Sequence, residues 1–191
     1  MQIGLFFGSF NPIHTGHLII ANYMVDYTRL DEIWFVVSPQ NPFKVKDELL
    51  DEKERLHLLQ LAVEKDIRFK VSDIEMNLPR PSYTYLTLEH LRKTFQQHEF
   101  TLIVGGDNYQ EFHKWKEYKT ILEHHYVNVY ARIGIVEKPL LANHPKIKLF
   151  EVPLLNISST YIRETIQAGK SIRYLVPEAV RIEIESRKFY L

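Results

Sequence analysis

The stretch that decides the fold is Gly8-Ser9-Phe10-Asn11-Pro12-Ile13-His14-Thr15-Gly16-His17. It follows an apolar run and leads into a segment with helical spacing of apolar residues, so it predicts a strand, a tight turn and a helix. Gly8 permits a sharp turn and leaves room for a ligand beside the backbone. His14 and His17 should share one face at the helix start, where free N–H groups and the helix dipole favour an anion. The stretch therefore predicts a phosphate site.

The composition is that of an ordinary globular protein. The chain has 191 residues, 45% of them hydrophobic and 25% charged, which predicts a single domain over residues 1–191. Lys plus Arg and Asp plus Glu both number 24, so we expect no general attraction to nucleic acid. The absence of cysteine excludes disulfides, thiol nucleophiles and cysteine-ligated metals. No signal peptide and no apolar run of membrane-spanning length are found, so we expect a cytoplasmic protein with no membrane partner.

Strand-like and helix-like segments alternate along the chain. Apolar runs predict strands at 3–7, 32–38, 67–72, 100–104, 126–131 and 146–152. Helical patterns occur at 18–27, from 51 onward, at 84–97, shortly after 107, at 120–125, at 157–167 and from 177 onward. This alternation predicts an α/β fold with a single doubly wound, mostly parallel sheet and helices on both faces. Ligands bind such sheets where the strand order reverses, so Gly8 and the strand end at Gly105–Asp107 should line one crevice.

A second candidate anion site is Ile157-Ser158-Ser159-Thr160-Tyr161-Ile162-Arg163. Hydroxyls and amides at a helix start, with an arginine one turn later, suit the phosphates of a nucleotide. The alternatives are an ordinary N-cap with an exposed arginine and, for His14 and His17, structural histidines or zinc ligands. The dinucleotide fingerprint G-x-G-x-x-G and the P-loop G-x-x-x-x-G-K-[S/T] are absent, which disfavours dehydrogenases and P-loop enzymes.

Both stretches together resemble the motifs of the H-x-G-H nucleotidyltransferase superfamily, which implies a Rossmann-like nucleotidyltransferase fold. The resemblance implies that His14 and His17 face the α-phosphate, while Lys44 and Arg163 face the leaving pyrophosphate. It implies an ATP site made by Gly8, Ser9, Phe10, Gly16, Gly105, Asp107, Ile157, Ser158, Ser159 and Thr160. Asp107 would approach the ribose; the alternative is an N-cap for the next helix. Mg²⁺ would be held largely by phosphate and water, so a set of protein ligands is not required.

Within the superfamily, the chain resembles the bacterial nicotinate-nucleotide adenylyltransferases. The resemblance rests on Asp73-Ile74-Glu75, on Ser82-Tyr83-Thr84-x-x-Thr87-Leu88, on Gly106-Asp107 followed by Trp115, and on Tyr174-x-Val176-Pro177. Phe43 stands where that branch usually has the histidine of P-H-K, and Ile133 stands where it usually has proline. The resemblance implies ATP and nicotinate mononucleotide as substrates in NAD synthesis, with nicotinate adenine dinucleotide and pyrophosphate as products. The acceptor-binding residues would be Asn41, Tyr83, Thr84 and Trp115.

Several alternatives stay open at this stage. The chain could be a phosphopantetheine adenylyltransferase, a cytidylyltransferase or a non-catalytic sensor that binds ATP. Trp115 could be one of several aromatic residues that pack a helix into the core, in the pattern Phe112-x-x-Trp115-x-x-Tyr118. The sequence does not decide between nicotinate and nicotinamide mononucleotide, and it is compatible with a homo-oligomer.

Overall fold

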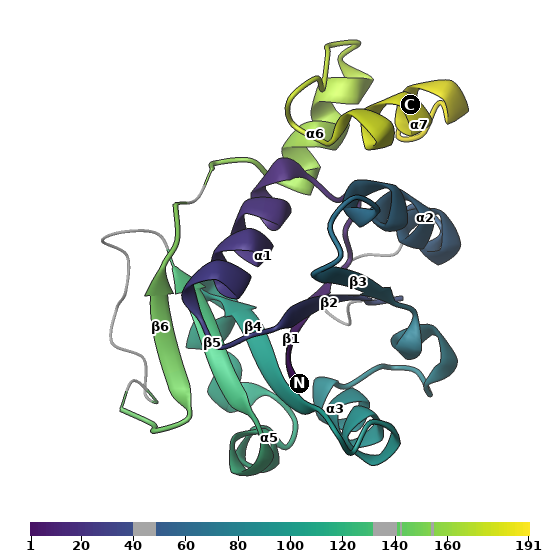
Figure 1. The fold of residues 1–191 in the computed structure, drawn as a ribbon. Helices are drawn as coiled ribbons and strands as arrows, with labels where there is room; N and C mark the ends of the chain where they lie inside the picture. Colours follow the sequence, from purple (N-terminus) through teal and green to yellow (C-terminus); the bar gives the residue numbers. More distant parts are fainter. Residues whose placement is uncertain (40–48, 132–140, 142, 154) are drawn as a thin grey trace.

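The computed structural model describes residues 1–39, 49–131, 141, 143–153 and 155–191 (Figure 1). In this part of the chain, strands form one sheet in the order β3-β2-β1-β4-β5-β6, and every neighbouring pair is parallel. The strands are β1 (Gln2–Gly8), β2 (Glu32–Val37), β3 (Phe69–Ser72), β4 (Glu99–Gly105), β5 (Tyr126–Ala131) and β6 (Ile147–Glu151). The predicted parallel α/β sheet is confirmed, and each strand begins and ends within two residues of its predicted bounds.

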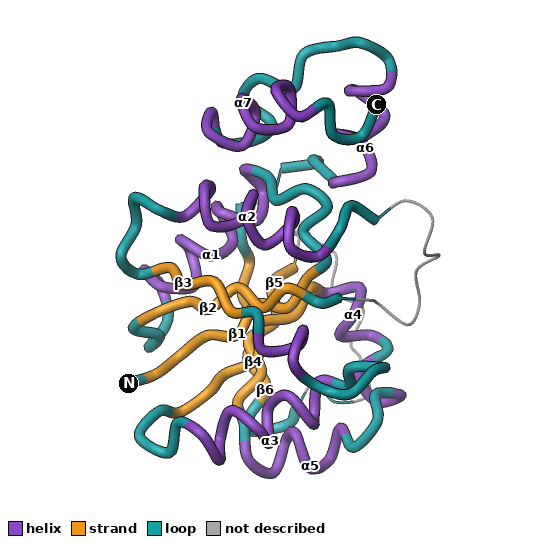
Figure 2. Tube along the Cα trace, turned by 90° about the vertical axis from the view of Figure 1, so that its right-hand side faces the viewer, coloured by secondary structure: helices purple, strands orange, loops and turns teal. Residues whose placement is uncertain are grey.

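Helices cover both faces of the sheet, which Figure 2 shows as a layer between them. One apolar cluster contains residues of α1 (Thr15–Tyr27), α2 (Glu52–Val63), α6 (Ser159–Gln167) and α7 (Glu178–Arg187). The other contains residues of α3 (Thr84–Thr94), α4 (Gly106–Gln110) and α5 (Tyr118–His124), together with the 3₁₀ turn η3 (Phe112–Lys114). A further 3₁₀ turn, η2 (Ile74–Asn77), follows β3. None of the described helices is long and apolar enough to cross a membrane.

The apolar strand sequences explain the two-sided burial. Successive strand residues point to opposite faces, so a strand covered on both sides must be apolar throughout. In β1, Ile3 and Leu5 lie in the cluster with α3 to α5, whereas Phe6 lies in the cluster with α1 and α2. The fold therefore follows from the near-continuous hydrophobicity of its central strands.

The strand order reverses between β1 and β4, which are hydrogen-bonded neighbours with Phe6 opposite Ile103. β1 is followed by the Gly8–His17 turn, and β4 by Gly105–Asp107. Because neighbouring parallel strands end at the same edge, the two segments meet at the position where such folds bind ligands. The two segments that were predicted to line one crevice therefore lie next to each other.

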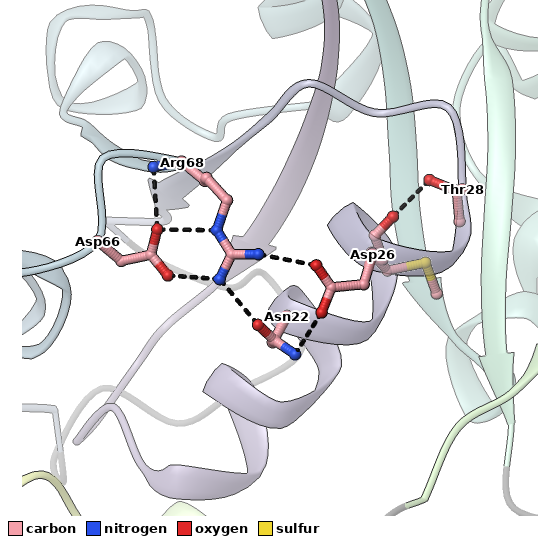
Figure 3. Close-up of polar contacts among 6 residues, drawn as sticks. Asn22, Asp26, Thr28, Asp66 and Arg68 are labelled. Carbon is pink, nitrogen blue, oxygen red and sulfur yellow. Dashed lines mark hydrogen bonds and ion pairs between the residues drawn. The ribbon is translucent and has the colours of Figure 1, made fainter.

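The opposite end of α1 is tied to β3 by Arg68 (Figure 3). Its guanidinium bonds Asp66 through two nitrogens at 2.9 and 2.7 Å, and it reaches Asp26 and Asn22 of α1, each at 2.8 Å. Arg68 and its two acidic partners are each about a third or more exposed, so we expect each ion pair to contribute at most about 1 kcal/mol. The network orients α1, whose other end carries the histidine pair.

Candidate active site

The turn after β1 is packed by its own aromatic residue. Phe10 has φ of 44°, in the left-handed region, and its ring is 2% exposed. A Cβ on Gly8 would lie 2.9 Å from that ring, so glycine is needed here to let Phe10 fold back over β1. The space that we expected beside Gly8 for a ligand is therefore filled by protein. ATP contact by Gly8, Ser9 and Phe10 stays a prediction.

The two histidines lie together at the start of α1, as their spacing predicts. Their ring centroids are 3.7 Å apart with an interplanar angle of 29°. The His14 backbone N–H donates to Nδ1 of His17 at 3.3 Å. A neutral His17 therefore carries its proton on Nε2, which makes that atom a hydrogen-bond donor. Gly16 makes the stacking possible, because a Cβ there would lie 3.0 Å from Nδ1 of His14.

His14 is buried in a way that keeps it neutral. The residue is 6% exposed, and its buried Nδ1 has no hydrogen-bond partner in the part of the chain that the structure describes. Desolvation lowers the pKa of His14 from 6.5 to about 4. At pH 7 the pair therefore contains at least one uncharged imidazole. A buried polar atom without a partner lowers the free energy of unfolding. Such atoms are uncommon in native proteins, and functional sites are one place where they occur.

The second motif lies directly against the first, although the two are far apart in the sequence. Ser159 Oγ donates to the carbonyl of Pro12 at 2.9 Å, and Arg163 Nη1 donates to the carbonyl of Asn11 at 3.0 Å. In Figure 1 the start of α6 meets the start of α1. Ser158 is an N-cap that accepts from Tyr161 N–H at 3.1 Å, so the capping alternative holds for that residue.

The remaining residues of that motif are placed as follows. Thr160 is exposed in the first turn of α6. Ile157 is half-buried and packs against the apolar cluster that contains residues of α1, α2, α6 and α7. Arg163 is also half-buried, so the exposed-arginine alternative is wrong. Two helix starts and one guanidinium thus surround the same turn, which is an arrangement suited to a polyphosphate.

The wall opposite is formed where β4 ends. Gly105 is the N-cap of α4, and Asp107 lies exposed in its first turn, so the N-cap alternative for Asp107 is wrong. A Cβ on Gly105 would lie 3.1 Å from the hydroxyl of Tyr130, which packs on this glycine. Burial, and to a lesser degree the charge of Asp107, raises the pKa of Tyr130 to about 12. Tyr130 therefore stays a neutral hydroxyl beside the carboxylate.

An aromatic row connects this wall to the histidines. The Phe6 ring lies 5.8 Å from Tyr130 and 6.0 Å from His17, measured between ring centroids. It packs edge-on against both, which is a preferred aromatic geometry. Phe6 therefore links Tyr130, at the end of β5, to His17 at the start of α1.

Two of the predicted acceptor residues lie at the start of α3. Tyr83 is the N-cap of α3 and Thr84 its first residue. The Nζ of Lys116 lies 4.4 Å from the Tyr83 ring centroid, which places the residue after Trp115 against the start of α3. Trp115 is half-buried and tilted on Phe112 at 5.1 Å. Lys116 therefore places a cation beside Tyr83, and acceptor binding by Tyr83, Thr84 and Trp115 stays a prediction.

A buried carboxylate supports this side of the site. Glu75 is 2% exposed and accepts from Thr87 Oγ1 at 2.9 Å. Burial raises the pKa of Glu75, while hydrogen bonds from Ser38, Thr87 and Ser82 act to lower it. These partners come from the end of β2, from α3 and from the segment before α3. Glu75 therefore fixes the Ser82–Thr84 segment to the sheet.

Four predicted positions lie outside the described residues: Asn41, Phe43, Lys44 and Ile133. Among the residues that are described, no three histidines or carboxylates gather into a metal site. A Mg²⁺ ion carried on triphosphate oxygens and water does not need such a group, so the predicted Mg²⁺ is compatible with this donor set.

Four residues near the site were given no role from the sequence: Arg55, Glu75, Tyr130 and Lys116. Arg55 carried the clearest signal, because it falls on the apolar face of its predicted helix, four residues before Leu59. A charged residue on a buried face needs partners, and these come from distant loops. Glu75 belongs to a motif that we recognised, but no pattern indicated that it is buried.

The chain matches known proteins along its whole length. The matching family model is described as cytidylyltransferase-like and covers residues 5–165. A probable nicotinate-nucleotide adenylyltransferase of Flavobacterium johnsoniae is 50% identical over 100% of this chain and 99% of the relative. One from Cytophaga hutchinsonii is 50% identical over 100% of this chain and 98% of the relative. Nicotinic acid mononucleotide adenylyltransferase of Plasmodium falciparum, complexed with NaAD, has the same fold, with a TM-score of 0.82 at 18% identity over 99% of this chain and 97% of that one. The chain belongs to the cytidylyltransferase-like family and, within it, to the nicotinate-nucleotide adenylyltransferases.

Proposed function

We propose that the protein joins nicotinate mononucleotide to ATP, giving nicotinate adenine dinucleotide and pyrophosphate in NAD synthesis. The observation that carries the proposal is the stacked pair of His14 and His17 at one helix start, with Arg163 of a second helix bonded to the same turn. The family relationship specifies the substrates, which the geometry by itself does not. The phosphopantetheine adenylyltransferases and the cytidylyltransferases share the motif but transfer the nucleotide to other acceptors.

The reaction needs no protein nucleophile. A phosphate oxygen of the mononucleotide forms a bond to the α-phosphorus of ATP, and the bond from that phosphorus to the bridging oxygen of the β-phosphate breaks. Negative charge grows on the non-bridging oxygens and on the departing pyrophosphate. Catalysis therefore consists mainly of positioning and of stabilising charge.

The residues divide this work. We assign His17 Nε2–H as a donor to the α-phosphate, because Nδ1 of the same ring is already occupied. His14 forms the buried neutral side of the pair. Arg163, and by resemblance Lys44, face the leaving pyrophosphate. Mg²⁺, when bound with ATP, would neutralise part of the phosphate charge.

The acceptor would bind between the start of α3 and Trp115. The pyridinium ring of nicotinate mononucleotide is a cation that gains from an aromatic face, which Trp115 can offer. Its carboxylate needs hydrogen-bond donors, which the Thr84 hydroxyl and the N–H groups at the start of α3 supply.

The test measures pyrophosphate release from a nucleoside triphosphate, with each acceptor in turn. We expect steady turnover with nicotinate mononucleotide and Mg²⁺, and much slower turnover with phosphopantetheine or with CTP and an alcohol phosphate. Parallel assays with nicotinamide mononucleotide measure the preference between the two pyridine nucleotides. Binding of ATP without pyrophosphate release in the presence of any of these acceptors would identify a sensor and refute the proposal.

A further inference from the structure

Arg55 is a buried cation beside the candidate active site. It lies in the first turns of α2 and is 1% exposed. Its Nε donates to the carbonyl of Leu50 at 2.9 Å, Nη1 to Ser9 at 2.5 Å and to Ser38 at 3.0 Å, and Nη2 to Pro39 at 3.1 Å. One side chain thus forms four hydrogen bonds to backbone carbonyls.

These acceptors come from three separate segments. Ser9 belongs to the turn after β1 that leads to His14, and Ser38 and Pro39 follow β2. Leu50 precedes α2, and its own N–H donates to Oδ1 of Asn11 at 3.1 Å. The guanidinium therefore joins the carboxyl ends of two neighbouring strands to α2, at the base of the phosphate turn.

The charge of Arg55 has no direct counter-ion among the described residues. Its four acceptors are neutral carbonyls, and the carboxylates of Glu52 and Asp51 attract it without forming an ion pair with it. Burial lowers the pKa of Arg55, but an arginine stays protonated at any pH of interest. A charge that is buried without a partner is a poor way to stabilise a fold, because apolar residues of similar volume serve as well or better.

The geometry points to Arg55 as a positioning residue for the phosphate turn. Its bond to Ser9 fixes the strand end from which the turn departs, and so the direction in which His17 presents its donor. Its positive charge lies within hydrogen-bond distance of the Ser9 carbonyl, in the turn that the proposed function assigns to the triphosphate. This inference rests on the proposed function.

The experiment compares Arg55→Lys and Arg55→Met with Val63→Ala, a destabilising control in the same helix. Val63 is 6% exposed and lies two turns further along α2. Melting temperature, kcat and the KM for each substrate are measured well below the lowest melting temperature, with near-ultraviolet circular dichroism to confirm folding. Lysine keeps the charge but has three donors instead of five and no planar fork.

We expect Arg55→Lys to lower kcat about 10-fold or more and Arg55→Met about 10²-fold, the effect of misplacing reacting groups by about 1 Å. Val63→Ala should keep kcat within about twofold at a similar loss of melting temperature. If Arg55→Met does not fold, the lysine variant decides. A folded lysine variant with wild-type kcat, or a control that loses as much kcat, would overturn the assignment. Absence of turnover in the unsubstituted protein would instead refute the proposed function.

Discussion

Lowering the pH should destabilise this protein through His14. The pKa of that residue falls from 6.5 in the unfolded chain to about 4 in the folded one, because burial disfavours the imidazolium. The depression corresponds to about 3 kcal/mol against the charged form. The unfolded chain binds the proton more readily than the folded one, so stability is lost as the pH falls from 6.5 to 4 and is fully present above 6.5.

His14→Gln isolates this contribution, since glutamine does not titrate in the range. Free energies of unfolding are measured by urea titration at pH 7 and pH 4.5 for both proteins. We expect the unsubstituted protein to lose about 2.5 kcal/mol more than the variant between these pH values. His125 is also buried and its pKa is also lowered, but it is present in both proteins and cancels. Equal losses in the two proteins would show that His14 is not the buried neutral group inferred here.

The same linkage reports where the phosphate binds. A triphosphate close to His14 favours the imidazolium, so a non-hydrolysable ATP analogue should raise the pKa of His14 and bind with uptake of up to one proton near pH 5.5. Calorimetry in buffers of different ionisation enthalpy measures this uptake. We expect the uptake to disappear in His14→Gln; uptake that persists there would assign the proton to another group.

Three further predictions concern single side chains. His17→Ala should lower kcat about 10²–10³-fold with little change in the KM for ATP, as for the loss of one donor to a developing charge; normal turnover would refute the role. Arg163→Ala should raise the KM for ATP, and Arg163→Lys should recover little of the loss, because the bidentate fork is absent; unchanged ATP kinetics in both variants would argue for a purely structural contact with Asn11. Trp115→Ala should raise the KM for nicotinate mononucleotide severalfold at unchanged KM for ATP. Because Trp115 is half-buried, the variant should also lose about 2 kcal/mol of stability, less than a full core truncation; equal damage to both substrates would assign Trp115 to the core.

Much of the fold could be predicted because its signals are local. The run Glu-Ile-Trp-Phe-Val-Val of β2 is apolar on both faces, which only a strand covered on both sides explains. Gly8 to His17 combines a turn, a helix start and a pair of imidazoles within ten residues. Helix ends are predicted less accurately. α3 ends at Thr94, three residues before the predicted end, and the Phe95 N–H donates to the carbonyl of Leu91.

The contacts that complete the site were not predictable, because they join distant segments. Ser159 bonds Pro12 across 147 positions of sequence, and Arg163 bonds Asn11 across 152. No periodicity carries such information, and only the motif resemblance placed the two stretches together. Gly8 is an example of a wrong prediction from local sequence. The sequence predicts room for a ligand beside it, but the ring of Phe10 fills that space.

Three energetically unfavourable groups of this protein lie around one turn. Among the described residues, Nδ1 of His14 is buried without a partner and Arg55 is buried without a counter-ion, and Phe10 adopts left-handed backbone angles. Each of these costs stability, and apolar clusters on both faces of the sheet offset the cost. All three would gain from an anion at the start of α1, or hold the turn that receives it. Groups that cost stability persist where function requires them, so the place of these three at the strand-order reversal supports the proposal that this turn binds a phosphate.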